Sequence, residues 1–116
     1  MDYKELTAYC LSKTGAYEDY PFGPDPLVMK VASKIFAFFS VVDGWIHIAL
    51  KCEPEAAELL RLEYAAVKPG YHLNKRHWNT VVIDGTIPAE ELRGMIDHSY
   101  TLVVRKLTRA EKERIG

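Results

Sequence analysis

The densest cluster of apolar residues, residues 34–42, predicts the central strand of a β-sheet. Phe36 and Phe38 are expected on one face of this strand, so that both faces are at least partly covered. The residues expected on the opposite face are Ile35, Ala37, Phe39 and Val41. Asp43-Gly44 follows directly, and an Asp-Gly pair between two apolar runs is typical of a type I′ hairpin turn. Residues 45–51 are therefore predicted to pair back antiparallel.

Apolar residues at helical spacing predict a helix near each end of the chain and one in its middle. The first helix begins at Asp2, which forms a capping-box pattern with Glu5. The middle helix spans residues 53–63, and the longest spans roughly residues 88–105, each with a proline in its first turn. Residues 108–111 have the pattern that caps a short final helix. The residues expected on the buried side of the middle helix are Ala56, Ala57, Leu59 and Leu60. The stripe expected on the longest helix consists of Leu92, Met95, Ile96, Ser99, Leu102 and Val103.

Shorter apolar runs at residues 27–31, 65–68 and 80–84 predict three more strands, the first joined to the central strand by a turn at Ala32-Ser33. Residues 16–26 hold three prolines and a glycine, which predicts an ordered loop with aromatic anchors. The elements therefore follow the order helix, three strands, helix, two strands, helix. This order predicts an α+β fold, with an antiparallel sheet of about five strands packed on one face by the terminal helices. The opposite, partly polar face is the expected binding surface.

Composition narrows the class of protein. At 116 residues, with 48% hydrophobic and 27% charged residues, the chain is typical of one globular domain. No apolar run approaches the roughly 18 residues of a membrane span, and the acidic N-terminus lacks the apolar stretch of a signal peptide. Cys10 and Cys52 are too few for a disulfide framework. We therefore expect a cytoplasmic monomer without membrane contact, and the net charge of -1 disfavours a protein that coats DNA non-specifically.

Basic and aromatic residues occur together, without any acidic residue, in one segment, residues 67–83. No carboxylate occurs between Glu63 and Asp84, whereas the same interval holds three basic residues, two histidines and Trp78. A carboxylate-free interval of this kind produces a local positive potential in a chain that is otherwise nearly neutral.

Five motifs of the chain resemble those of the MmcQ/YjbR family. They are P-F-G-P-D at 21–25, K-V-A-S-K-I-F-A-F at 30–38, L-K-C-E-P-E at 50–55, P-G-Y-H-L-N-K-R-H-W-N-T-V at 69–81 and I-D-H-S-Y-T-L-V at 96–103. The resemblance implies a fold similar to that of the CyaY/frataxin group and, through the family's label of double-wing DNA-binding protein, nucleic-acid binding. One departure is Ser33, which stands where the family often has glycine; a positive φ there would cost serine roughly 1 kcal/mol.

A nucleic-acid site is therefore predicted around residues 68–78. Lysine and arginine would meet phosphates, and Trp78 or Tyr71 could stack on a base. The predicted site residues are Lys34, Lys51, Lys68, His72, Asn74, Lys75, Arg76, His77 and Trp78. In a structural interpretation, Trp78 instead plugs the core while His72 and Asn74 bind backbone groups of an irregular loop. The two interpretations are compatible.

Other functions have less support in the sequence. His72, His77 and His98 are the candidate metal ligands, but their spacing matches no established metal motif, and no metal or other cofactor is predicted. Cys52 precedes a helix N-terminus, yet no base accompanies it, so we expect a buried thiol and no catalytic residue or enzymatic activity. The expected partner is DNA or another nucleic acid. The alternative is an adaptor or small-ligand domain, whose protein or small-molecule partner binds the exposed sheet face or the aromatic loop 17–24.

Overall fold

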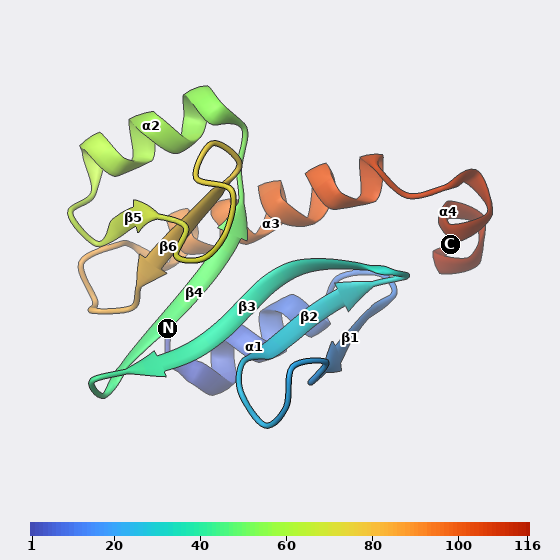
Figure 1. Ribbon diagram of the computed structural model, residues 1–116, viewed down its shortest axis with the longest axis horizontal. Coiled ribbons are helices and arrows are strands. Elements are labelled where there is room, and N and C mark those ends of the chain that lie inside the picture. Colours follow the sequence, from blue (N-terminus) through green and yellow to red (C-terminus); the bar gives the residue numbers. More distant parts are fainter.

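A computed structural model describes residues 1–116 and confirms the predicted α+β fold (Figure 1). The helices are α1 (Tyr3–Leu11), α2 (Pro54–Glu63), α3 (Ala89–Arg105) and α4 (Arg109–Ile115). The strands are β1 (Ala16–Asp19), β2 (Leu27–Val31), β3 (Lys34–Val42), β4 (Trp45–Lys51), β5 (Val67–Pro69) and β6 (Trp78–Val82). They form one 6-stranded sheet in the order β1-β2-β3-β4-β6-β5, and every neighbouring pair is antiparallel. The sheet therefore has six strands rather than about five.

The hairpin of β3 and β4 confirms the prediction for the centre of the chain. Asp43 and Gly44 have φ values of 52° and 82°, and a positive φ at both central residues is the signature of a type I′ turn. Val42 lies directly opposite Trp45, so the turn contains only these two residues.

A β-bulge in β3 changes which aromatic side chains share a face. The pairing of β2 with β3 shifts between Met29 and Lys30, which leaves Phe36 as an extra residue in β3. Phe36 is buried and packs edge-on against Tyr100 of α3, with ring centroids 5.3 Å apart. Phe38 lies on the opposite face of the sheet. The prediction that Phe36 and Phe38 share a face is therefore wrong, because strict alternation fails at a bulge.

Two strand boundaries also differ from the prediction. Residues 16–19 form β1, whereas the sequence predicts an ordered loop there. As an edge strand β1 pairs only with β2, so the prolines that follow it do not interrupt a ladder. β6 begins at Trp78 rather than at residue 80, so Trp78 is a residue of this strand and pairs with Lys51 of β4.

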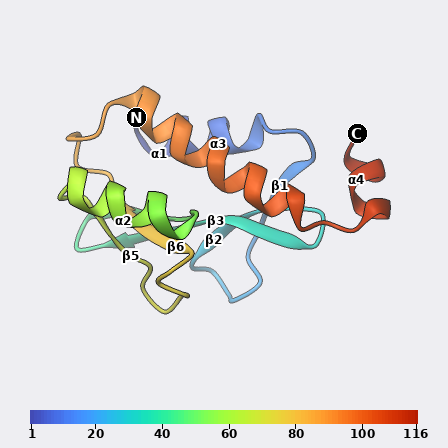
Figure 2. The same cartoon turned by 90° about the horizontal axis from the view of Figure 1, so that it is seen from above.

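The helices α1, α2 and α3 lie on one side of the sheet, as Figure 2 shows. The core lies between these helices and the sheet, and it includes every residue of the predicted α3 stripe except Leu102, which is half-buried. On α2 only Ala57 is fully buried, and Leu59 is 65% exposed, so its predicted burial is wrong. None of the helices is long and apolar enough to span a bilayer.

The short helix α4 is attached to the turn between β2 and β3. Thr108 and Glu111 form the predicted capping box. One carboxylate oxygen of Glu111 also accepts hydrogen bonds from the Ser33 hydroxyl, at 2.6 Å, and from the Ser33 amide, at 3.1 Å. The residue with a positive φ in this turn is Ala32, at 51°, so Ser33 is not strained. Ser33 instead connects α4 to the sheet.

Candidate functional site on the open sheet face

The face of the sheet opposite the helices carries a cleft between two loops. Residues 20–26 join β1 to β2 and residues 70–77 join β5 to β6. Both loops project on the side away from α1 and α3 (Figure 2). The cleft has a volume of ≈ 410 Å³, its lining contains no Lys, Arg, Asp or Glu, and its polar side chains include those of Ser40, His47 and Thr80. This arrangement suits a ligand with flat, weakly polar groups.

Aromatic rings form a row across this face. Phe38 lies at its centre, stacked with Phe22 at a centroid distance of 6.5 Å and in edge-to-face contact with Trp78 at 5.4 Å. Phe22 remains 64% exposed and Tyr71 76% exposed at opposite walls of the cleft. Exposed ring faces on rigid supports can stack on nucleobases or other planar groups.

Trp78 packs on the open face of the sheet rather than in the core. Its ring is half-buried against Phe38 and is not part of the buried core, so the prediction that it plugs the core is wrong. Trp78 also lines a hollow at the end of the sheet, together with Asn74 and His77.

The loop of residues 70–77 is held in place by Arg61 of α2. The Arg61 Nε donates to the Oδ1 of Asn79 at 2.7 Å, and its Nη2 donates to the backbone oxygens of Lys75 and Trp78. Asn79 is buried and in turn donates to the backbone oxygen of Ala57 at 3.3 Å. The sequence prediction assigned no site role to Arg61, because an isolated arginine on an acidic helix is more typical of a solvated face.

Local backbone features complete the loop. At Gly70 a Cβ would lie 2.8 Å from the Trp78 Cβ, so only glycine allows this close approach to β6. The Oδ1 of Asn74 accepts from the Arg76 amide at 2.9 Å, as the structural interpretation predicts for Asn74. His72 has a φ of 60° and lines the cleft beside Tyr71, whose ring centroid lies 4.0 Å from its own.

Two predicted phosphate-binding residues stand free on this loop. Lys75 and Arg76 are exposed, and neither forms an ion pair in the structure. Arg76 contributes its backbone to the loop, and its guanidinium has no carboxylate partner. The loop that supplies one wall of the aromatic cleft therefore also carries two unneutralised cations.

A second group of predicted residues meets where β4 ends. Lys51, Asn74, His77 and Trp78 line one hollow of ≈ 430 Å³, together with Lys106 of α3. Burial, followed by the charges of Lys106 and Lys34, lowers the pKa of the Lys51 ammonium group. The structure thus brings four of the predicted residues together in one hollow. Lys34 acts on Lys51 through its charge, and Lys68 is exposed on the outermost strand β5.

The positive charge does not extend over the whole face. At the β1 edge, Lys30 is paired with Asp19 at 3.3 Å and its ammonium group lies 5.8 Å from the ring centroid of Tyr17. The face is therefore basic towards β5 and β6, neutral and aromatic in its middle, and mixed in charge at β1.

The three candidate histidines lie in different places, and both thiols are buried. No three His, Cys, Asp or Glu side chains are close enough to hold a metal ion. His72 lines the open-face cleft, whereas His98 lies in a groove on the helix side, so the three candidate histidines are not assembled. Cys10 and Cys52 are free and buried, as predicted, and burial raises the pKa of the Cys10 thiol to about 12.

Comparison with known proteins agrees with the resemblance in the sequence. The YjbR family model matches residues 11–102. The chain belongs to the YjbR family. The uncharacterized protein YjbR of Escherichia coli K12 is 35% identical over 113 residues, which cover 97% of this chain and 96% of that protein. The uncharacterized protein YbdF of Escherichia coli O157:H7 is 38% identical over 96 residues, 83% of this chain and 79% of that protein.

Solved structures show the same architecture. A Deinococcus radiodurans crystal structure assigned to domain family DUF419 superposes with a TM-score of 0.89 and 37% identity, covering 97% of this YjbR-family chain and 86% of that chain. A Pseudomonas syringae crystal structure gives a TM-score of 0.77 at 28% identity, covering 88% of this chain and 98% of that chain. The open sheet face between two loops thus belongs to a fold present in solved relatives.

Proposed function

We propose that this protein is a non-enzymatic nucleic-acid-binding domain, and that a single strand of DNA or RNA lies across the open sheet face. In this proposal one or two bases stack on Phe22 and Tyr71, and the backbone phosphates meet Lys75 and Arg76. The observation that carries the proposal is a neutral aromatic cleft with one wall, Tyr71 and His72, on the same loop that carries Lys75 and Arg76, two exposed cations without an ion pair. Stacking platforms next to basic residues are the common feature of single-strand binding surfaces.

A single strand fits this site better than a duplex. Aromatic side chains can stack only on bases that are unpaired and turned outwards, whereas the bases of a duplex are covered by their neighbours. The basic area is also small and the net charge is -1, so binding that depends on phosphate contacts alone would be weak.

Fluorescence anisotropy with a labelled dT12 strand and with the corresponding dT12·dA12 duplex, each at low and moderate salt, tests the proposal. We expect the single strand to bind more tightly than the duplex. The double variant Lys75→Glu/Arg76→Glu should weaken binding and reduce the slope of log K against log salt by about 1.4, since each lost phosphate contact contributes about 0.7. Tyr71→Ala should weaken binding about tenfold, in line with the loss of one stacked base.

The matched control is Lys4→Glu/Lys112→Glu, which makes the same change in charge on α1 and α4 at exposed residues without an ion pair. This control should retain most of the affinity. Equal losses in the two double variants would show a response to net charge alone and would contradict a site on the loop of residues 70–77.

A small planar ligand is the second candidate for the same cleft. The volume of ≈ 410 Å³ and the absence of charged residues from the lining favour it, because most small-molecule sites have these properties. In that case a metabolite, and no oligonucleotide, would raise the melting temperature, and the response would depend on Phe22 and Tyr71 but not on Lys75 and Arg76.

A further inference from the structure

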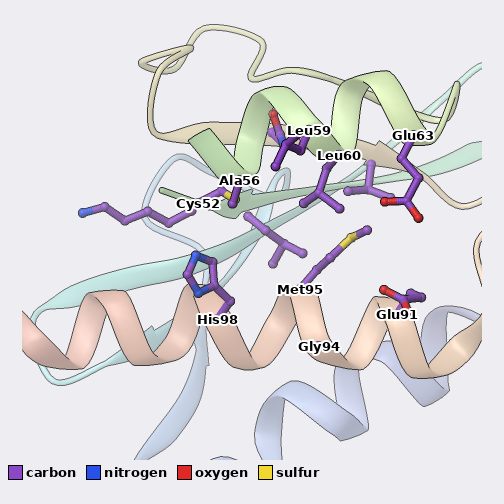
Figure 3. Close-up of a pocket in the computed structure, with 13 residues that line it drawn as sticks. Cys52, Ala56, Leu59, Leu60, Glu63, Glu91, Gly94, Met95 and His98 are labelled. Carbon is purple, nitrogen blue, oxygen red and sulfur yellow. The ribbon is translucent and has the colours of Figure 1, made fainter. Parts of the chain in front are cut away.

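The helix side of the molecule contains a groove that the proposed function does not use. It lies between α2 and α3, has a volume of ≈ 380 Å³, and is floored by Leu50 and Val81 of the sheet. Leu60 of α2 and Met95 of α3 face each other across it (Figure 3). The sheet separates this groove from the cleft on the open face.

The wall of the groove formed by α3 has a glycine, Gly94, that contacts within the chain do not explain. Gly94 occupies the middle of α3, where glycine destabilises a helix relative to alanine. Its φ is not positive, and a Cβ at this position would have no atom within 4 Å. Neither backbone conformation nor packing within the chain therefore requires glycine here. A molecule lying in the groove against the backbone of α3 does account for it.

The two ends of the groove differ in chemistry. At one end Glu63 of α2 and Glu91 of α3 face each other across its mouth (Figure 3), and neither carboxylate forms an ion pair. At the other end lie Cys52 and His98, and the His98 Nε2 already accepts a hydrogen bond from the Glu53 amide.

We propose that the groove binds a small molecule with an apolar body and a single cationic group, with the cation between Glu63 and Glu91 and the body along Leu60, Met95 and Gly94. The apolar lining supplies the area that the body of the ligand buries. Two unpaired carboxylates at one end fix its orientation and select a positive over a negative head group. The volume lies within the range of sites for small organic ligands.

Three probes with the same apolar body test the proposal: 4-phenylbutylamine, 4-phenylbutanol and 4-phenylbutyrate. Titration of the 15N-labelled protein at low salt should give amide shifts at Gly94 and along α2. Affinity should fall from the amine to the alcohol to the carboxylate, and the amine should bind about tenfold more tightly than the alcohol, as expected for two exposed carboxylates.

Two variant pairs decide the result. Glu63→Gln/Glu91→Gln should bring the amine to the affinity of the alcohol, whereas Glu58→Gln/Glu90→Gln, which removes the same charge at exposed positions outside the groove, should preserve the preference. Gly94→Leu should fill the groove and lower the affinity for both amine and alcohol at least tenfold, whereas Ala110→Leu on α4 should not. Equal affinity for amine and carboxylate, shifts on the open face only, or unchanged binding by Gly94→Leu would overturn the proposal.

Discussion

At the scale of single residues, the side chains that hold the site in place are not the ones that would touch a ligand. Arg61 connects α2 to two backbone oxygens of the loop and to the buried Asn79. The cations that remain free, Lys75 and Arg76, are held on a loop whose shape depends on Arg61 and on Gly70. The sequence alone predicts the free cations from their composition. It does not predict Arg61, because its partners lie 14 to 18 positions away in the chain.

Arg61→Leu should therefore destabilise the protein more than the loss of an ordinary surface arginine. The substitution keeps the apolar stem but leaves the Oδ1 of the buried Asn79 and the backbone oxygen of Lys75 without their donor, whereas the Trp78 oxygen keeps the Gly70 amide. A buried oxygen without a donor costs about 1–3 kcal/mol, and the lost bond to Lys75 adds to this. We expect a loss of at least about 2 kcal/mol in the free energy of unfolding, measured by urea denaturation. Arg114→Leu on α4 is the control and should change it by less than about 0.5 kcal/mol. Similar values for the two variants would contradict the bridging role.

The turn between β2 and β3 gives a second prediction for single residues. Ala32 carries the positive φ of 51°, whereas Ser33 donates to Glu111 through both its amide and its hydroxyl. Ala32→Gly should stabilise the protein by about 0.5 kcal/mol, since relief of the left-handed conformation exceeds the entropy that glycine adds to the unfolded chain. Ser33→Gly should instead destabilise it, because a hydrogen bond to a charged group is lost. Thermal unfolding of the two variants should show a higher melting temperature for Ala32→Gly and a lower one for Ser33→Gly. A higher melting temperature for Ser33→Gly would contradict the role of Ser33 in holding Glu111.

At the scale of elements, sequence patterns predict most of the fold and fail where two elements meet. The capping boxes of α1 and α4 and the Asp43-Gly44 turn depend on neighbouring residues only, and all three are confirmed. The bulge at Phe36 depends on the pairing of β2 with β3, and β1 exists because β2 offers it an edge. The hydrophobic periodicity of a single segment gives no information on how that segment pairs with another strand, so it predicts neither the bulge nor β1. The exposed position of Leu59 has the same origin, because no element covers that part of the groove.

The attachment of α4 should depend on pH. Hydrogen bonds from the Ser33 hydroxyl and from the Thr108 amide lower the pKa of the Glu111 carboxyl from 4.5 to about 2. A lowered folded-state pKa contributes stability that is fully present above pH 4.5 and is lost as the pH falls through about 2. The Ser33 amide proton should therefore shift with a midpoint near pH 2 in an NMR titration of the folded protein, and Glu111→Gln should abolish the shift. A titration midpoint near 4.5 would mean that α4 is not held through this carboxylate.

At the scale of the whole molecule, one sheet separates two surfaces of different character. The helix side buries the core and leaves a groove between α2 and α3, whereas the open side presents a row of aromatic rings flanked by two loops. The resemblance in the sequence indicated nucleic-acid binding through residues 68–78, and the structure places Asn74, His77 and Trp78 of this segment around one hollow with Lys51 and Lys106. The structure also adds Phe22 and the strand residues that line the cleft, such as Phe38 and His47, to the candidate site. The sequence prediction of the site, which followed the basic segment, included none of them.

The most direct test of the proposed function is a map of amide shifts on adding a dT8 strand to the 15N-labelled protein at low salt. The proposal predicts shifts in the loops of residues 20–26 and 70–77 and in the middle of β4, with α2 and the groove side of α3 unchanged. It also predicts that these shifts shrink as salt is raised. If saturating oligonucleotide left both loops and β4 unchanged, or moved only residues of the helix side, nucleic-acid binding by the open face would be contradicted.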